Sequence, residues 1–386
     1  MEFRGEENFE HGEIPAVGIL LTNLGTPDSP TFKGLWWYLR EFLSDRRVIE
    51  LPRIFWLPLL YLVILNTRPQ KSAEAYRSVW TDEGSPLLVI TRKQGEGVEA
   101  RLRKHISSPL HVAIGMRYGN PSIAKGLKEL AEKGCRRILV LPLYPQYSAT
   151  TTGSTFDALA KELTQWRWVP ELRTVSSYHD HPGYIDSLAA SIRERWNAEG
   201  EPEKILYSFH GIPKRYFLGG DPYHCQCLKT ARLVSEKLGL EKDRWVVSFQ
   251  SLFGKEEWIK PYTDATITAL AKGGLKSLDV ACPGFSADCL ETIEEIDEEN
   301  REYFEENGGE HFRYIAALND RSDHLDALTN VALRHLKGWV AEGDSWDEAA
   351  AQRESQESKR RADELVARCP IPDHGGFGAD SPSSSS

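Results

Sequence analysis

The chain has 386 residues, which is room for two to three domains, since globular domains average about 150 residues. Hydrophobic residues make up 40% and charged residues 27%, and eleven Trp with fourteen each of Tyr and Phe provide large apolar groups, so a mainly disordered protein is excluded. With 47 basic and 57 acidic residues the net charge is −10, and the whole chain carries no electrostatic footprint for nucleic acid.

The cysteine content and the N-terminal segment indicate in which cellular compartment the protein is expected. Six cysteines in so long a chain are too few for a disulfide scaffold, which favours a reducing environment. Residues 1–13 are acidic and lack the apolar stretch of a secretory signal, so we expect a disordered leader. Together these features predict a cytoplasmic protein.

Short apolar runs alternate with amphipathic stretches of helical length along the chain. The runs are AVGILLTNLG (16–25), PLHVAIGMRYG (109–119), RRILVLPLYPQYS (136–148), EKILYSFHGIP (203–213), RWVVSFQSLFG (244–254) and LKSLDVACPGF (275–285). The stretches SIAKGLKELAEKG and YTDATITALAKGG end in Gly, as helices commonly do. This alternation predicts an α/β protein with two doubly wound parallel sheets, joined near residues 170–185.

The expected domains follow from this alternation and from the change in composition after residue 341. They are an N-terminal Rossmann-like lobe (14–175), a C-terminal Rossmann-like lobe (176–320), a C-terminal helix that packs back on the lobes (321–340), and a charged helix or disordered tail (341–386). Ligands of such sheets bind beyond the carboxyl ends of the strands, which predicts one cleft lined by YPQYS, SFHGIP, QSLFG and CPGFS.

The longest apolar run, residues 54–65, has twelve residues and includes a Pro, whereas a spanning helix needs about 20. It therefore cannot cross a bilayer. It could lie on a membrane, with Trp56 and Tyr61 at the level of the headgroups. A buried core helix is the other interpretation, and composition alone favours it.

Two segments carry the strongest candidates for chemistry. His210 ends an apolar run, where an imidazole can accept a proton or bind a metal, although a structural histidine at a strand end is equally compatible. Acidic residues at 288, 291, 295, 298 and 302 are spaced by three and four, which predicts one helix face able to hold a cation. Alternatively, Asp288 and Glu291 form an N-cap and capping box.

Two further motifs have less specific spacing. YPQYSATTTGST (144–155) is typical of an anion loop between a strand and a helix, but an ordinary turn is the more common structure for such a segment. HCQC (224–227), together with Cys282 and Cys289, fits the spacing of no standard zinc or iron-sulfur site.

Taken together, the motifs resemble ferrochelatase, the terminal enzyme of haem synthesis, from about Gly18 to Trp339. The matching pieces, in the family's order, are LLTNLGTP, GSPL, IGMRYGNP, LYPQYSATTTGST, SFHGIPKRY, GDPY, SFQSLFGKEEWIKPYT and CPGFSADCLETIEE. The resemblance implies two Rossmann-like lobes around a porphyrin cleft, as in chelatases of the bacterial type. It also places residues 54–65 at a lip over the cleft, which favours peripheral membrane contact over a core helix.

The resemblance further implies roles for individual residues. His210 and Glu291 would be the catalytic pair on opposite faces of the macrocycle, and His210, Glu291, Glu295 and Glu298 would handle the metal. Positions that match the substrate pocket are Arg68, Tyr76, Arg117, Tyr118, Ser251, Trp258 and Phe285, of which Arg68 and Ser251 would bind propionates. Cys289 stands where many relatives carry His. A terminal cysteine cluster is absent, so no permanently bound cofactor and no [2Fe-2S] cluster are expected.

The implied reaction inserts Fe(II) into protoporphyrin IX and releases two protons, as the last step of haem biosynthesis. Protoporphyrin IX and ferrous iron are then the partners, with no oligomeric state assigned. A close alternative is the same chemistry on coproporphyrin III, and cobalt chelation for corrinoid synthesis is another. A haem or porphyrin carrier without catalysis is the alternative of a different class.

Overall fold

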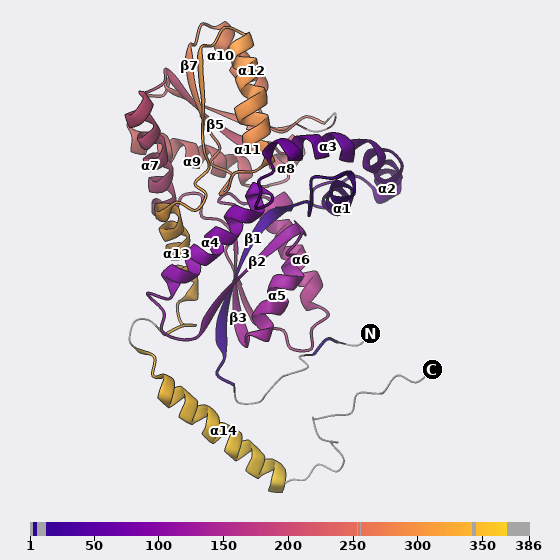
Figure 1. Ribbon diagram of the computed structural model, residues 1–386, viewed down its shortest axis with the longest axis vertical. Coiled ribbons are helices and arrows are strands. Elements are labelled where there is room, and N and C mark those ends of the chain that lie inside the picture. The colour runs from indigo at the N-terminus through magenta and orange to yellow at the C-terminus, as the bar shows by residue number, and fades with distance from the viewer. Residues whose placement is uncertain (1–2, 6–12, 253, 255, 342–344, 369–386) are drawn as a thin grey trace.

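Two parallel four-stranded sheets form two lobes in the computed structural model, which describes residues 3–5, 13–252, 254, 256–341 and 345–368 (Figure 1). The first sheet has the order β2-β1-β3-β4, with β1 (Ala16–Thr26), β2 (Leu110–Gly119), β3 (Cys135–Pro142) and β4 (Glu171–Thr174). The second has the order β6-β5-β7-β8, with β5 (Lys204–His210), β6 (Trp245–Gln250), β7 (Ser277–Ala281) and β8 (His311–Ile315). The α/β prediction is confirmed, although the short edge strands β4 and β8 were not predicted.

Helices connect the strands and flank both sheets. The α-helices of the first half are α1 (Phe32–Leu43), α2 (Arg53–Leu59), α3 (Leu65–Val79), α4 (Pro86–Leu102), α5 (Ile123–Glu132), α6 (Ser154–Leu163) and α7 (Pro182–Glu199). Those of the second half are α8 (Lys214–Leu218), α9 (Tyr223–Leu238), α10 (Thr263–Lys272), α11 (Leu290–Thr292), α12 (Arg301–Glu306), α13 (Ser322–Leu336) and α14 (Glu348–Arg368). Three π-helices, with wider turns, are η1 (Leu60–Ile64), η2 (Ala149–Gly153) and η3 (Ile293–Asn300).

Helix α5 illustrates how the sequence specifies these elements. The Ser122 hydroxyl accepts from the Lys125 N–H and caps the helix, which then buries Ile123 and Leu127 against the sheet. Gly126 lies so close to β2 that a Cβ there would approach the Ile114 carbonyl to 2.7 Å. Only a glycine therefore allows this helix to pack directly on the strand.

One apolar core runs through both lobes. In β1, Ile19 and Leu21 point into this core, whereas Leu20 points to the opposite face against α5, as the alternation of a strand requires. In the second sheet, Tyr207 and Phe209 of β5 enter the same shared core. Helices α4, α7, α9 and α13 supply the rest of it, and α13 packs against both α7 and α4. The C-terminal helix thereby joins the two lobes.

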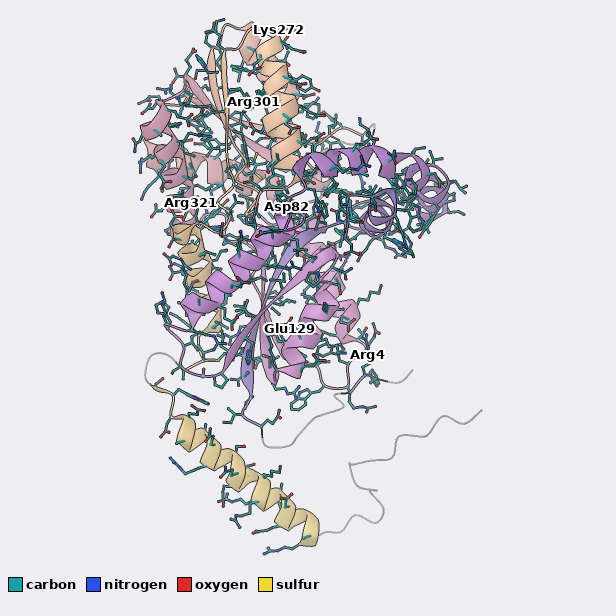
Figure 2. The ribbon with its side chains drawn as sticks, viewed as in Figure 1. Arg4, Asp82, Glu129, Lys272, Arg301 and Arg321 are labelled. Atoms are coloured by element: carbon teal, nitrogen blue, oxygen red, sulfur yellow. The ribbon has the colours of Figure 1, made fainter. Side chains whose placement is uncertain are left out.

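An ion pair holds the start of α13 in this position. The Arg321 guanidinium donates to both carboxylate oxygens of Glu194 on α7, at 2.7 and 2.8 Å, and Figure 2 shows Arg321 at the junction of the lobes. Farther on, α14 extends away from both lobes (Figure 1). Of the expected leader, Arg4 pairs through its backbone with Gln165 and Arg167, and residues 1–2 and 6–12 lie outside the described residues, as do 342–344 and 369–386.

Helices α1, α2 and α3 with η1 form a helical arm that projects from the lobes (Figure 1). Ile54, Phe55 and Leu62 are 74–75% exposed on it, so the interpretation of residues 54–65 as a core helix is wrong for this face. Trp56 was expected at the surface but is 3% exposed, because its indole N–H donates to the Leu43 carbonyl at 2.7 Å and its ring packs inside the arm. No helix among the described residues is long and apolar enough to cross a membrane.

A buried carboxylate attaches the arm to the first sheet. Asp45, which follows α1, accepts hydrogen bonds from Arg117 and Tyr118 of β2 and from Ser154 at the start of α6. The side chains of Arg117 and Asp45 are only 15% and 5% exposed. Burial by itself raises the pKa of Asp45, but the Ser154 hydroxyl and the Arg117 charge outweigh it and lower that pKa.

Replacing Asp45 with Ala is expected to lower the free energy of unfolding by about 3–5 kcal/mol, because Arg117 is left buried without its counter-charge. Denaturant unfolding followed by circular dichroism measures this loss. The matched control is Asp157→Ala, which breaks the exposed pair with Arg47 and should change stability by less than about 1 kcal/mol. Equal effects of the two substitutions would contradict the structural role of Asp45.

Candidate functional site

His210 lies at the carboxyl end of β5, next to Gln250 at the end of β6. Its Nδ1 is 2.6 Å from the Gly211 carbonyl oxygen. A carbonyl oxygen can only accept a hydrogen bond, so this contact requires the proton on Nδ1, and in the neutral imidazole Nε2 is then the nitrogen with the lone pair that can act as a base or metal ligand.

Trp258 packs beside this imidazole, with ring centroids 6.2 Å apart. A Cβ on Gly211 would lie 3.0 Å from the indole and 3.1 Å from the Gln250 carbonyl, so any larger residue would crowd the point where the chain turns away from His210. The Trp258 Nε1 is buried and has no partner among the described residues. It is therefore a free donor next to the expected catalytic base.

The carboxylates lie in the segment after β7, on α11 and η3. The Glu295 carboxylate accepts from the Ser251 N–H at 2.7 Å and from the Ser251 hydroxyl. The Gln250 amide donates to the Glu291 carbonyl at 2.9 Å and contacts Glu295 at 3.4 Å. Ser251 has a positive φ of 65°, a strained conformation for a residue other than glycine. Ser251 thus fixes the Glu295 carboxylate beside the end of β6, and Gln250 fixes the backbone at Glu291.

The charges of this cluster act on one another. Burial raises the pKa of Glu295, the Ser251 hydroxyl and His210 oppose this rise, and Glu291 adds to it. His210, Glu291 and Glu295 therefore share one electrostatic environment. Burial, and then the charge of Glu299, raise the pKa of the neighbouring Glu294 to about 7.

The π-helical turn changes the face on which the acidic residues lie. α-Helical spacing predicted one straight stripe, but η3 has a wider turn, and the Asn300 side-chain amide donates to the Glu295 carbonyl at 2.6 Å. Glu298 and Glu302 are exposed, whereas Glu291 and Glu295 are partly buried. The expected continuous stripe is therefore not formed.

Asp288 precedes the helix and organises the loop. Its carboxylate accepts from the Tyr314 hydroxyl at 2.6 Å, from the Ala317 N–H at 3.1 Å and from the Asn319 amide at 2.7 Å. The predicted capping box of Asp288 and Glu291 is wrong, because the N-cap is Cys289, which pairs reciprocally with Thr292. Asp288 instead ties the start of α11 to the end of β8.

Tyrosines of the other lobe surround Glu291. Tyr76 of α3 and Tyr38 of α1 are buried with ring centroids 6.3 Å apart. Burial first, and the charge of Glu291 next, raise the pKa of Tyr76, and Glu291 also contributes to the raised pKa values of Tyr38 and Tyr144. These phenols remain protonated and can donate toward the cluster. Glu291 thus faces the arm and the first sheet.

The structure brings together only some of the expected substrate residues. Ser251 and Trp258 flank His210 and Glu295, and Phe285 packs near Leu87 between α4 and the loop after β7. Arg117 and Tyr118 are bonded to Asp45 instead. Arg68 lies exposed on α3.

The remaining motifs serve other purposes. In the expected anion loop, the Ala149 N–H donates to the Asp221 carboxylate of the other lobe at 2.8 Å, so a protein side chain already occupies that turn. HCQC lies on α9, with Cys225 exposed and Cys227 buried. The described residues contain no group of three or more His, Cys, Asp or Glu side chains arranged to hold a metal. Cys369 lies outside them, and the absence of an iron-sulfur cluster stays a prediction.

Sequence reasoning missed Gln250 and Glu294 as members of the site. Gln250 ends an apolar run, as His210 does, and this position could have identified it from the sequence. Its side chain also accepts from the Ser208 hydroxyl at 2.7 Å, which holds the amide toward the glutamates. Nothing in the sequence pattern indicated Glu294, because α-helical spacing places it away from the face that carries the other acidic residues.

The comparisons with known proteins identify the family of the chain. The model of the family Ferrochelatase matches residues 16–336. The ferrochelatase of Thioalkalivibrio sulfidiphilus is 57% identical over 362 residues, covering 94% of this chain and 98% of that one. The ferrochelatase of Hydrogenovibrio crunogenus is 57% identical over 369 residues, covering 95% and 97%.

A solved structure shares the fold at low identity. SirB from Bacillus subtilis with Fe3+ superposes with a TM-score of 0.51 at 12% identity, covering 84% of this chain and 97% of that chain. This likeness concerns the fold alone. Because the family model spans both sheets and the relatives align over nearly their full length, the chain belongs to the ferrochelatase family, the enzymes that insert a metal ion into a porphyrin.

Proposed function

We propose that the protein inserts Fe(II) into protoporphyrin IX, with His210 as the principal base. The observation that carries this proposal is that the Gly211 carbonyl engages Nδ1 of His210 and not Nε2, while the charges of His210 and Glu291 both act on the Glu295 carboxylate beside the carboxyl ends of β5 and β6. A dication that enters the macrocycle displaces two pyrrole protons, so the reaction needs both a proton acceptor and anionic groups.

The division of roles follows from the surroundings of each group. His210 accepts the pyrrole protons at Nε2, while its Nδ1 stays bound to the Gly211 carbonyl. Glu295, whose pKa is raised by burial, accepts a proton more readily than a solvated carboxylate and passes it toward the exposed Glu298. Glu291 supplies negative charge for the arriving iron.

The porphyrin would rest on aromatic and apolar groups. Trp258 and Phe285 offer ring faces for stacking, and the Tyr76 hydroxyl lies near Glu291. Arg68, exposed on α3, would bind a propionate, whereas the Arg117 charge is neutralised by Asp45. Binding energy used to bend the ring would expose a nitrogen lone pair to the iron.

The helical arm supports peripheral attachment to a membrane. Its exposed Ile54, Phe55 and Leu62 lie together with the exposed Leu59 and Val63. Such a surface stabilises contact with the acyl region of one leaflet without crossing it. A poorly soluble tetrapyrrole could then pass between the lipid and the site without entering water.

His210→Ala is expected to lower the rate of anaerobic Fe(II) insertion by about 10²–10⁴-fold, because the general base is lost. The measurement follows the Soret shift of protoporphyrin IX, and fluorescence quenching should show that the variant still binds the porphyrin. His311→Ala, at an exposed position at the start of β8, is the control and should keep full activity. Tight porphyrin binding by the wild type without turnover would support the carrier alternative.

Protoporphyrin IX is expected to be turned over with a kcat/KM at least about tenfold above that of coproporphyrin III. Coproporphyrin carries propionates in place of both vinyl groups, and burying charge beside apolar groups is unfavourable. Parallel assays with the two porphyrins under identical detergent conditions measure the ratio. A ratio below one would assign the chain to the coproporphyrin reaction.

Ile54→Glu combined with Phe55→Glu is expected to weaken binding to vesicles by about tenfold or more, because each exposed apolar side chain contributes about 1.5–3 kcal/mol when buried in lipid. Cosedimentation with phosphatidylcholine–phosphatidylglycerol vesicles measures the bound fraction. Val169→Glu with Leu228→Glu is the matched control, since these exposed apolar residues lie outside the arm. Unchanged binding of the arm variant would refute the membrane contact.

A further inference from the structure

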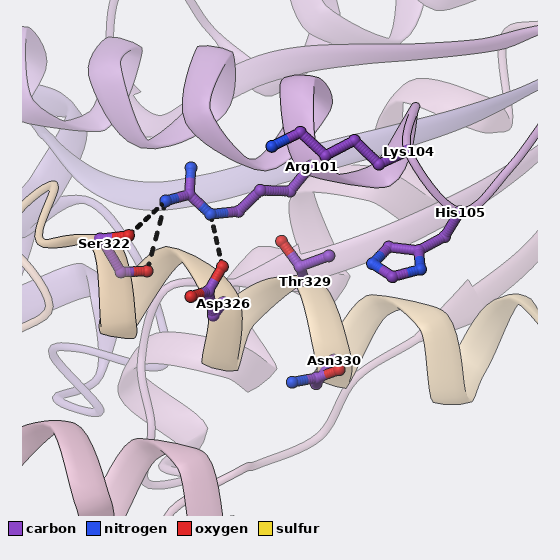
Figure 3. A pocket seen from close by; sticks show the side chains of 7 residues that line it. All are labelled: Arg101, Lys104, His105, Ser322, Asp326, Thr329 and Asn330. Carbon is purple, nitrogen blue, oxygen red and sulfur yellow. Dashed lines mark hydrogen bonds and ion pairs between the residues drawn. The ribbon is translucent and has the colours of Figure 1, made fainter.

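An open cavity of about 610 Å³ lies away from the iron-insertion site, where the C-terminal end of α4 meets α13 and the start of α7. Lys104, Arg334 and Lys337 line it together with His181. A second cavity of similar volume adjoins it and shares Lys104, His105 and Asn330. Figure 3 shows Lys104 and His105 at the end of α4, opposite Thr329 and Asn330 of α13.

The cations of this cavity differ from Arg101, which lines the adjoining cavity, in having no ion-pair partner within the described part of the chain. Arg101 is committed to Asp326 at 2.6 Å and to the Ser322 hydroxyl at 2.9 Å (Figure 3). Among the described residues, no carboxylate lies within ion-pair distance of Lys104, Arg334 or Lys337. Three exposed cations therefore line one cavity, and none of them has an ion-pair partner among the described residues.

His181 adds an unsatisfied polar group to the same cavity. The residue is 8% exposed, yet neither Nδ1 nor Nε2 has a hydrogen-bond partner among the described residues. A buried imidazole without partners is unfavourable by about 1–3 kcal/mol. Such an orphaned group points to a ligand that supplies the missing bonds.

The start of α7 contributes backbone donors. His181 is the N-cap of this helix, but its side chain makes no capping bond, and Pro182 occupies the first position. The N–H groups of Gly183 and Tyr184 in the first turn therefore have no carbonyl within the helix to bond. A helix N-terminus of this kind attracts anions.

We propose that this cavity, formed by Lys104, His181, Arg334, Lys337 and the N-terminus of α7, binds a small phosphate-bearing anion. The C-termini of α4 and α13 carry partial negative charge, which by itself would favour cations at this place. It does not explain why a buried imidazole at the start of α7 has no hydrogen-bond partner in the described part of the chain. Because α4 belongs to the first lobe and α7 and α13 join the shared core, a bound anion connects the two lobes directly.

Calorimetric titration with pyrophosphate at low ionic strength tests the site. The wild type should bind pyrophosphate at one site per chain, with a raised melting temperature, and affinity should fall as salt increases. Lys104→Ala combined with Arg334→Ala should weaken this binding by about tenfold or more, since each cation makes a charge-assisted contact. His181→Leu should also weaken it, because both ring nitrogens are removed.

The matched control is Lys242→Ala with Lys272→Ala, which removes two exposed cations elsewhere and should leave pyrophosphate affinity unchanged; Figure 2 shows Lys272 at the far end of the second lobe. Iron insertion without pyrophosphate should be unaffected in every variant, which shows that each one folds. Equal weakening by the control pair, or no binding to the wild type, would overturn the proposal. Tighter binding of tricarballylate than of pyrophosphate would replace phosphate with a polycarboxylate and overturn the assignment.

Discussion

The single apolar core that runs through both sheets is the constraint on which the rest of the structure depends. One face of the first sheet, through Ile19 and Leu21, and one face of the second, through Tyr207 and Phe209, are buried by the same helices. Each strand alternates its side chains between the two faces of its sheet. A one-residue slip in strand register would therefore move the buried apolar side chains to the opposite face. The carboxyl ends of β5 and β6 are thereby held toward the arm and the first lobe.

Within that frame, a few buried polar groups decide the geometry of the site. Gln250 bonds the backbone of Glu291 and contacts Glu295, and its own oxygen is held by Ser208. Asp288 fixes the other end of the same segment. These groups have little freedom, because a buried donor or acceptor that loses its partner is strongly unfavourable. The Glu295 carboxylate and the backbone at Glu291 are consequently held by the protein itself.

The arm and the cationic cavity lie at different ends of this frame. The arm carries apolar side chains outward, and Asp45 anchors its base to β2. The cavity at the end of α4 lies where the two lobes meet. The proposed contacts with lipid and with small anions would therefore involve separate parts of the chain.

The sequence by itself determined the class of fold, the central strands and the family, because buried parallel strands require unbroken apolar runs and because His210 and Glu291 stand in distinctive motifs. It could not determine the edge strands, the π-helical turn of η3, the burial of Trp56 or the commitment of Arg117 to Asp45. Each of these depends on partners distant in sequence. Tertiary packing alone decided them, since a side chain's exposure and charge partner are set by what the fold places against it.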